Sequence, residues 1–351
     1  MAYTTIDDPS EYFHTQLYTG DGNSTQAITN SGNSNLKPDW VWLKQRANDS
    51  ANRNHMLFDS TRGSTKALSS NTNGAEDTSS GGYIQSFNTD GFTTGSSSVI
   101  NKNAVTYVAW QWKANGGTTT TNDASSTSIG NTDSVIQANT EAGFSIVTFS
   151  GTGSGMTVAH GLGGTPDLII SKARNDTENW AVHTTIIDGS VDFLRLSETD
   201  AKGNSSFSAA TSTVFGYNGS NNYVVYCFRS IKGYSKIGSY TGNGAQDGTF
   251  VYTGFKPAFI LAKRTDAAKN WYIADSTRSP SNITKAFLSP NLSNAEDTSG
   301  DGTDAYFDIL SNGFKMRQDF SHLNASGAAH IYMAFAENPF VSSKGVPTTA
   351  R

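Results

Sequence analysis

The sequence predicts an all-β protein built from three tandem, divergent β-sandwich modules of jelly-roll-like type. Two observations support this prediction: the amino-acid composition and a set of motifs that recurs along the chain. Only 16% of the residues are charged, whereas the chain contains 19 Phe, 14 Tyr and 6 Trp. Because each aromatic side chain buries a large area, a few of them suffice for several small cores. The abundant Gly, Ser, Thr and Asn favour short strands joined by turns over helices.

The recurring motifs begin with a glycine-rich turn. Tyr18-Thr-Gly-Asp-Gly22 returns as Tyr240-Thr-Gly-Asn-Gly244 and, more weakly, as Phe149-Ser-Gly-Thr-Gly153. Each turn precedes a proline and an apolar strand that ends in lysine: Pro38-Asp-Trp-Val-Trp-Leu-Lys44, Pro166-Asp-Leu-Ile-Ile-Ser-Lys172 and Pro257-Ala-Phe-Ile-Leu-Ala-Lys263. Each copy closes on an aromatic strand: Tyr107–Trp112, Tyr223–Phe228 and Tyr332–Ala336. Colinear self-similarity of this kind is the mark of a repeat protein.

The first and third copies agree further. Asp59-Ser-Thr-Arg62 matches Asp275-Ser-Thr-Arg278, and Ala75-Glu-Asp-Thr-Ser79 matches Ala295-Glu-Asp-Thr-Ser299. The chain is therefore divided into an N-terminal arm (1–11), module 1 (12–114), a Thr/Ser-rich linker (115–136), module 2 (137–233), module 3 (234–340) and a C-terminal tail (341–351). We expect modules 2 and 3 to pack firmly together, because they join almost directly, and the linker to place module 1.

Alternation within the strands indicates how they are buried. Trp40 and Trp42 share one face of their strand, while Val41 and Leu43 share the other. A strand that is apolar on both faces fits the middle of a packed sheet pair. Asp21-Gly22, Asp90-Gly91 and Asn312-Gly313 predict hairpin turns whose glycines take positive φ.

Charge and hydropathy narrow the classes of partner. The net charge of −5 and the pI of about 5.7 argue against nucleic acid, since phosphate binding needs a basic face. No apolar run approaches the roughly 20 residues of a membrane span, and the start, Met1–Pro9, lacks the pattern of a secretory signal. The single cysteine, Cys227, permits no internal disulfide and is predicted to be a small buried residue.

No catalytic, cofactor or metal motif appears, so we expect a non-enzymatic protein without cofactor or metal, and ligand-binding residues remain unassigned. The stretch closest to a nucleophile elbow, Gly151–Gly155, has the wrong spacing. His160-Gly-Leu-Gly163 is interpreted as a turn before the Pro166 strand. The histidines are scattered, and each is predicted to be structural or exposed: His14, His55, His160, His183, His322 and His330.

Carboxylates leave an enzymatic alternative open, because a glycosidase needs only two of them. However, Glu76-Asp77 and Glu296-Asp297 lie in equivalent loops, which favours a role in bracing the loops. The loop Asp297–Asp304 concentrates oxygen ligands suited to calcium, although it lacks the EF-hand spacing. Lys44, Lys172 and Lys263 end equivalent strands and are predicted to make a contact within the fold.

Several of these segments also resemble a known group of proteins. They are Met1–Pro9, Tyr18–Gly22, Pro38–Lys44, Asp59-Ser-Thr-Arg-Gly63 and the end, Ala336–Arg351. The chain resembles repeat-containing virion proteins of marine tailed phages, usually described as structural or tail-fibre-like proteins whose repeat is a domain of unknown function. The resemblance covers nearly the whole chain. It implies a virion location and supplies no catalytic or ligand residues.

The expected function is therefore that of a structural protein on the phage particle, either a tail fibre or adhesin for host attachment or a capsid decoration protein. The competing interpretation is a carbohydrate-active module: a lectin-like receptor binder or, less favoured, a polysaccharide depolymerase. It rests on fold analogy, because β-sandwiches commonly host sugar sites. Expected partners are other virion proteins and, in the competing case, a host-surface glycan.

Three polar segments predict assembly. The arm (1–11) and the tail (341–351) cannot form cores of their own, so we expect one or both of them to dock onto neighbouring subunits. The Thr/Ser-rich stretch 115–128 is either a mobile tether or an added strand on another subunit. We favour the second interpretation and hence a homotrimer.

Overall fold

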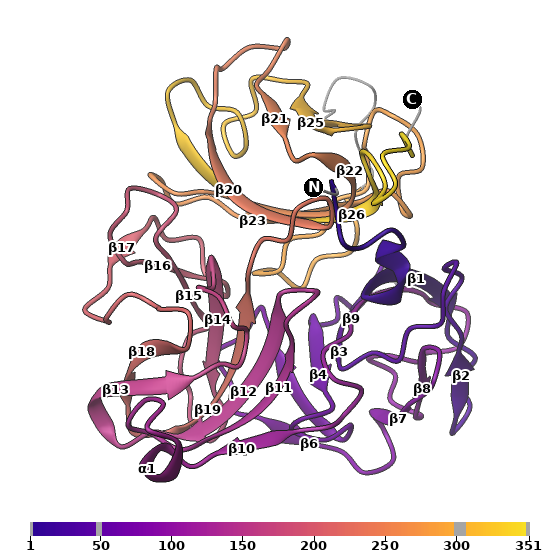
Figure 1. The fold of residues 1–351 in the computed structure, drawn as a ribbon. Helices are drawn as coiled ribbons and strands as arrows, with labels where there is room; N and C mark the ends of the chain where they lie inside the picture. The colour runs from indigo at the N-terminus through magenta and orange to yellow at the C-terminus, as the bar shows by residue number, and fades with distance from the viewer. Residues whose placement is uncertain (1–2, 47–50, 298–306, 349–351) are drawn as a thin grey trace.

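The computed structural model describes residues 3–46, 51–297 and 307–348 (Figure 1). In these ranges the regular secondary structure is almost entirely β-strand, with one short α-helix, α1 (Ala124–Thr127), and one 3-10 turn, η1 (Pro9–Glu11). The prediction of an all-β fold is confirmed. The division into three tandem modules remains an interpretation of the sequence repeat, and the sheets follow it.

Each predicted module contributes one large antiparallel sheet, and we give its strands in spatial order. Module 1 forms β1 (Phe13–Thr19), β9 (Thr106–Trp112), β3 (Trp40–Gln45), β4 (Met56–Asp59), β5 (Lys66–Ser69) and β6 (Asp77–Thr78). The second sheet contains β10 (Thr120–Asn122), β11 (Ser134–Asn139), β12 (Phe144–Ser150), β19 (Asn222–Phe228), β14 (Leu168–Ala173), β15 (Ala181–Thr184), β16 (Asp192–Arg195) and β17 (Gly203–Asn204). Module 3 forms β20 (Ser235–Thr241), β26 (Ala329–Pro339), β22 (Phe255–Arg264) and β23 (Trp271–Asp275).

The large sheets share one strand order and one register. The lysine-ended strand lies beside the closing aromatic strand in all three, with Trp40 opposite Trp112, Leu168 opposite Phe228 and Phe259 opposite Phe335. The strand of the glycine-rich turn lies on the other side of the aromatic strand as β1, β12 or β20. These pairings define structurally equivalent residues, which are used below.

A smaller sheet covers one face of each large sheet. These sheets are β2 (Gln26–Ile28), β8 (Phe92–Thr94) and β7 (Ile84–Phe87); β13 (Gly153–Ala159) and β18 (Val214–Gly219); and β21 (Phe250–Tyr252), β25 (Gly313–Met316) and β24 (Phe307–Leu310). Separate apolar clusters fill the space within each sheet pair, for example around Val41, Leu43 and Phe58 in module 1. Each pair is thus a two-layer β-sandwich with its own core.

Two predicted hairpin glycines behave differently. Gly91 has φ +87°, as predicted for its turn between β7 and β8. Gly313 does not have positive φ and lies inside β25. A Cβ there would meet the carbonyl oxygen of Val251 at 2.0 Å, so close strand packing requires this glycine. The prediction of positive φ at Gly313 is wrong because the turn residues are Ser311 and Asn312.

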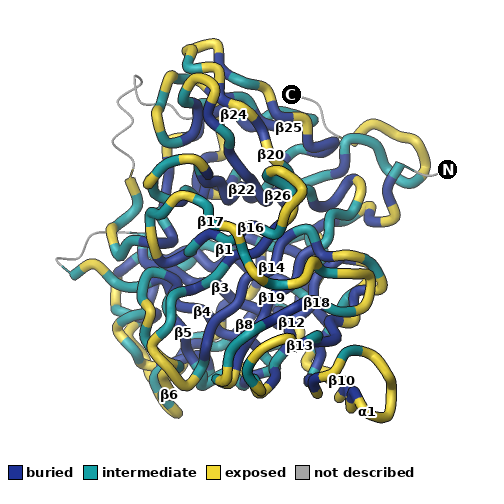
Figure 2. The backbone as a smooth tube through the Cα atoms, turned by 90° about the vertical axis from the view of Figure 1, so that its left-hand side faces the viewer, coloured by how far each residue is buried: buried dark blue, intermediate teal, exposed yellow. Residues whose placement is uncertain are grey.

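The other faces of the large sheets meet in a fourth core shared by all three modules. The equivalent rings of Trp112, Phe228 and Phe335 lie together, with centroids 5.6 Å apart for Trp112–Phe335 and 6.0 Å for Phe228–Phe335. Trp40 stacks on Tyr226 of module 2 at 4.4 Å. Figure 2 shows the central strands buried and the outer loops exposed. The strands are apolar on both faces because one face serves the sandwich and the other serves this shared core.

The structure corrects the predicted arrangement of the modules and the linker. Module 1 is not placed by a tether, since it shares the central core with both other modules. Within the predicted linker 115–136, β10 pairs with β11, and β11 pairs with β12 of the same chain. Asp123 caps helix α1 by accepting hydrogen bonds from the backbone N–H groups of Ser125 and Ser126. A polar segment is ordered here because the sheet satisfies its backbone while most of its side chains stay exposed.

The described part of the N-terminal arm also packs within its own chain. Ile6 keeps 2% of its surface exposed and belongs to the shared core. The Tyr3 hydroxyl donates to the carbonyl oxygen of Gly254 at 2.7 Å, and the backbone N–H of Ser343 donates to Asp7 at 2.6 Å. Arm and tail therefore lie together on module 3 (Figure 1). These residues need no neighbouring subunit to be ordered, because module 3 supplies a surface. Docking of one or both ends onto another subunit stays a prediction.

The shared core predicts that the modules unfold together. We expect Trp40→Ala to remove about 3–5 kcal/mol of stability, since it leaves a large cavity, and to lower one common transition. Calorimetry of the full chain measures this, with Phe58→Ala in the sandwich core of module 1 as the matched control. Separate transitions, with only one of them shifted by Trp40→Ala, would contradict a cooperative unit.

Candidate functional site: buried ion pairs between the modules

The most concentrated group of charges begins at the turn after β4. Asp59 ends that strand, and its carboxylate accepts a hydrogen bond from the backbone N–H of Arg62 at 2.7 Å. The same carboxylate contacts Nε of Arg62 at 2.5 Å, and both side chains are fully buried. The motif Asp-Ser-Thr-Arg thus folds back on itself and aims one guanidinium toward module 2.

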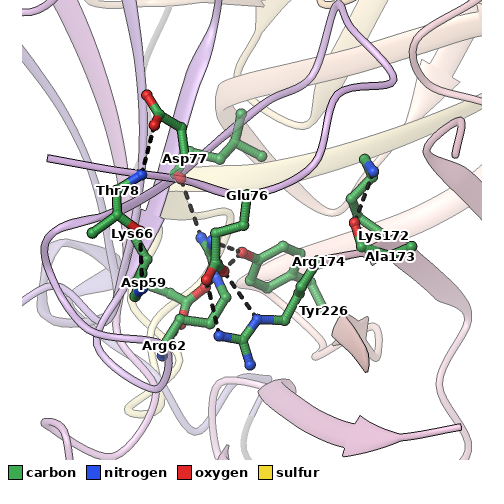
Figure 3. A network of polar contacts seen from close by, with 11 residues as sticks. Asp59, Arg62, Lys66, Glu76, Asp77, Thr78, Lys172, Ala173, Arg174 and Tyr226 are labelled. Atoms are coloured by element: carbon green, nitrogen blue, oxygen red, sulfur yellow. Dashed lines mark hydrogen bonds and ion pairs between the residues drawn. The ribbon is translucent and has the colours of Figure 1, made fainter. Parts of the chain in front are cut away.

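Glu76 joins this guanidinium to the neighbouring module (Figure 3). Its Oε2 lies 3.0 Å from Nη1 of Arg62 and 2.9 Å from Nε of Arg174, and its Oε1 lies 3.0 Å from Nη2 of Arg174. The backbone N–H of Glu76 also donates to the carbonyl oxygen of Arg174 at 2.7 Å. Bidentate pairing of this kind fixes orientation as well as distance. The loop of module 1 is therefore locked to the end of β14.

A hydroxyl from module 2 completes the network. Tyr226 donates to Oδ2 of Asp59 at 2.7 Å. Burial alone would lower the pKa of Arg62, but Asp59, Tyr226 and Glu76 raise it above its ordinary value. Burial likewise pushes the pKa of Glu76 upward, and the hydrogen bonds from Arg174 together with the charge of Arg62 hold it below the ordinary value. Arg62 and Glu76 are thus held in their charged forms.

The same network recurs between modules 3 and 1. Oε2 of Glu296 lies 3.0 Å from Nη1 of Arg278 and 2.9 Å from Nε of Arg46, which is the equivalent of Arg174. Trp110 takes the place of the tyrosine and donates from Nε1 to Oδ2 of Asp275 at 3.0 Å. Its ring also lies 5.3 Å from the guanidinium carbon of Arg278. Two of the three junctions between modules therefore use one chemistry.

The junction between modules 2 and 3 keeps the backbone contact without the ion pair. The N–H of Lys202 donates to the carbonyl oxygen of Thr265 at 2.7 Å, as Glu76 does to Arg174. Thr265 stands at the position of Arg46 and Arg174 and carries no charge. Lys202 instead binds carboxylates of its own module, Asp188 and Asp192. The divergence of module 2 in sequence thus has a direct counterpart in this junction.

The three equivalent lysines make internal contacts, as predicted. Nζ of Lys172 donates to the carbonyl oxygen of Ala173 at 2.7 Å, and Nζ of Lys263 donates to that of Arg264 at 2.5 Å. Nζ of Lys44 reaches across to module 3 and donates to the carbonyl oxygen of Ser293 at 3.0 Å. Burial lowers the pKa of each ammonium to about 8. Their recurrence reflects a fold contact and explains why lysine ends each strand.

The histidines and the cysteine are built into the packing. Nε1 of Trp42 donates to Nδ1 of His55 at 3.0 Å, His183 stacks on Phe207 at 4.6 Å, and His330 stacks on Tyr240 at 4.7 Å. Burial lowers the pKa of every imidazole and brings it to about 4 in three of them: His183, His322 and His330. Cys227 is buried, as predicted, and burial raises the pKa of its thiol to about 12.

The predicted bracing role of the recurrent acids is confirmed for Glu76 and Glu296 by their ion pairs. Burial raises the pKa of Asp39, but its carboxylate is fully covered and accepts hydrogen bonds from Ser60 and Ala114. The possible calcium loop, Asp297–Asp304, lies outside the described residues except for its first member. Within residues 3–46, 51–297 and 307–348, no cluster of His, Cys, Asp or Glu has metal-binding geometry.

Sequence reasoning missed Arg46 and Arg174, which form the ion pairs that link the recurrent glutamates to a neighbouring module. A signal was present, since each arginine stands two residues after an equivalent lysine. The third copy has Thr265 there, so the pattern did not recur in full. In the part of the chain that the structure describes, no helix has the length and apolar character needed to cross a bilayer.

Comparison with protein families gives one match. A family described as a domain of unknown function (DUF7483) matches residues 8–339. The chain belongs to this family. No curated protein and no solved structure matches the chain. The match spans all three sheet pairs and all three junctions, so the DUF7483 unit is the whole assembly and not a single sandwich.

The ion pairs of Glu76 and Glu296 between modules predict that the free energy of unfolding decreases at acid pH. Since the folded pKa of Glu76 lies below the unfolded value of about 4.3, its pairs stabilise fully above that pH and weaken as pH falls through the folded pKa. We expect Glu76→Gln to cost about 3 kcal/mol near neutral pH and progressively less below pH ~4. Denaturant unfolding across pH measures this.

Exposed Glu198 supplies the matched control, since it takes no part in the ion pairs of Glu76 or Glu296. Glu296→Gln should reproduce the loss, because its network has the same geometry. A loss for Glu76→Gln that stays constant down to pH 3 would contradict the electrostatic origin.

Proposed function

We propose that this chain is a non-enzymatic structural protein of a tailed-phage particle, exposed on the virion as a tail-fibre or adhesin component or as a capsid-surface protein. The proposal rests on the resemblance of the two ends and the repeat to virion proteins. Its partners are other virion proteins. DUF7483 family membership is compatible with this proposal and carries no function of its own.

The observation that best supports a structural role is how the buried ionisable groups are used. Glu76 and Glu296 lock modules together, and the three equivalent lysines bind backbone carbonyls. These are the side chains that a hydrolase would need in an open cleft with one acid kept protonated. A rigid protein whose buried charges are paired at internal junctions suits a component of a particle that must survive outside a cell.

The proposed homo-oligomer, a trimer by preference, needs a different basis from the one the sequence suggested. The stretch 115–128 lies along its own chain as β10 and α1, so its polarity is no longer an argument for a partner subunit. Support now comes from exposed apolar side chains on module 3, namely Phe250 and Tyr252, with 45% and 49% of their surface exposed. Both belong to β21 and leave a surface for a neighbouring protein.

The test is the location of the chain in purified particles. We expect it at fixed stoichiometry by mass spectrometry, and we expect an antibody against it to label the particle surface in electron micrographs. Light scattering of the isolated protein gives the oligomeric state, with Phe250→Ser as the variant expected to favour the monomer. Presence in infected-cell lysate and absence from particles would overturn the proposal.

Glycan binding is a second candidate, favoured by one observation in module 2. A cleft of about 300 Å³ is lined by Phe193, Phe207 and Tyr217 together with amide and hydroxyl side chains such as Asn204 and Ser205. Aromatic faces beside amides are the usual chemistry of sugar recognition. A glycan array should then show binding that Phe207→Ala removes and Phe250→Ser keeps. Release of reducing ends from host polysaccharide would instead indicate a depolymerase.

A further inference from the structure

One edge of the module 1 sheet lacks the partner strand that its equivalent has in module 2. In module 2, β12 lies between β19 and an added strand, β11. The equivalent strand of module 1, β1, pairs with β9 and ends the sheet. The N-terminal arm leaves β1 toward module 3 and does not take the place of β11.

The register shows which groups of β1 face that edge. The backbone N–H of Lys113 donates to the carbonyl oxygen of Tyr12, and that of Gly20 donates to Val105. Because hydrogen-bonding direction alternates along an antiparallel strand, the backbone groups of Phe13 and Thr15 point away from β9. Their equivalents Phe144 and Ile146 lie opposite Asn139 and Gln137 of β11. The outward backbone N–H and C=O groups of Phe13 and Thr15 have no hydrogen-bond partner among the described residues.

A groove of about 350 Å³ runs along this edge between modules 1 and 3. Its walls include Phe13, Thr15, Gly32, Ser276, Thr277 and Asn338. Thr15 keeps only 3% of its surface exposed, and its hydroxyl has no hydrogen-bond partner in the described structure. Unpaired N–H and C=O groups along a sheet edge are a template for pairing with another strand.

The contacts of β11 show what this groove would hold. Nε2 of Gln137 donates to the hydroxyls of Ser60 at 2.9 Å and Thr61 at 2.8 Å, across the junction with module 1. Oε1 of Gln137 accepts from the backbone N–H of Gly117 at 2.7 Å. Ser60 and Thr61 follow Asp59, as Ser276 and Thr277 follow Asp275. The Ser-Thr pair that binds the Gln137 amide between modules 1 and 2 therefore recurs as Ser276 and Thr277 in the wall of this groove.

The third equivalent edge is already closed. Ser235 of β20 bridges to Ile231, with N–H to carbonyl hydrogen bonds of 2.9 Å and 3.1 Å in the two directions. The hydroxyl of Ser230 accepts from the backbone N–H of Ile237 at 3.0 Å. Of the three equivalent edges, β12 is thus paired, β20 is capped, and β1 is open.

We propose that the edge of β1 binds a short extended segment of a partner protein as an added antiparallel strand, with a glutamine or asparagine side chain opposite Thr15 that contacts Ser276 and Thr277. Backbone pairing supplies affinity and the amide supplies register, as in other cases of strand addition. The strand β11 is the template for this occupant within the chain itself. The proposal is independent of the virion role.

The probe is a fluorescent peptide that copies residues 132–140, titrated into the full-length protein and followed by anisotropy. We expect one saturable site. Replacing the peptide residue that corresponds to Gln137 by alanine should weaken binding about tenfold, since it removes the hydrogen bonds of the side-chain amide. Thr277→Val should weaken the parent peptide and leave the alanine peptide unaffected.

A backbone variant tests the edge itself. Thr15→Pro removes an outward N–H and blocks pairing, while proline remains tolerated on an edge strand. Ser239→Pro at an outward position of β20 is its matched control and should bind as wild type. Thr61→Val, in the β11 junction, should also bind as wild type. Thr277→Val keeps the test decisive if Thr15→Pro does not fold. Absence of binding, or binding unaltered by Thr277→Val, would overturn the proposal.

Discussion

The architecture depends on burying both faces of three equivalent aromatic strands. A sandwich needs only one apolar face from its large sheet, yet Trp40, Trp110 and Trp112 place indole rings on the other face as well. A single module in water would expose these rings, so each sheet pair needs the other two. The ion pairs between modules, the inward-folded arm and the strand β11 all surround this shared core.

Much of the fold was predictable because a residue that recurs at equivalent positions of the repeat is expected to have the same structural role in each copy. Lysines at equivalent strand ends implied a fold contact, and the twice-repeated acids implied bracing; both predictions are confirmed by hydrogen bonds and ion pairs. The apolar character of both faces was also visible, but a sequence does not say whether the second face meets the sandwich or another module. The shared core was therefore missed, although its residues were identified.

The polar composition of the linker and the arm led to a wrong expectation of how these segments become ordered. The favoured interpretation placed the linker, and one or both termini, against another subunit because these segments are poor in apolar residues. Backbone groups are satisfied by a sheet irrespective of side-chain polarity, which is why Thr120–Asn122 forms a strand. One well-placed apolar residue, Ile6, suffices to anchor the arm. Composition predicts whether a segment can form a core, and the available neighbours decide whether it is ordered.

The three sheet pairs around one core resemble a trimer whose subunits are joined in a single chain. A trimer held by noncovalent contacts dissociates on dilution, because its stability depends on subunit concentration. Here the covalent connections fix the effective concentration of each module for the others, so dilution leaves the assembly intact. Joining the copies also lets each diverge separately, so one junction lacks the ion pair that the other two share, whereas a symmetric trimer would have three identical junctions.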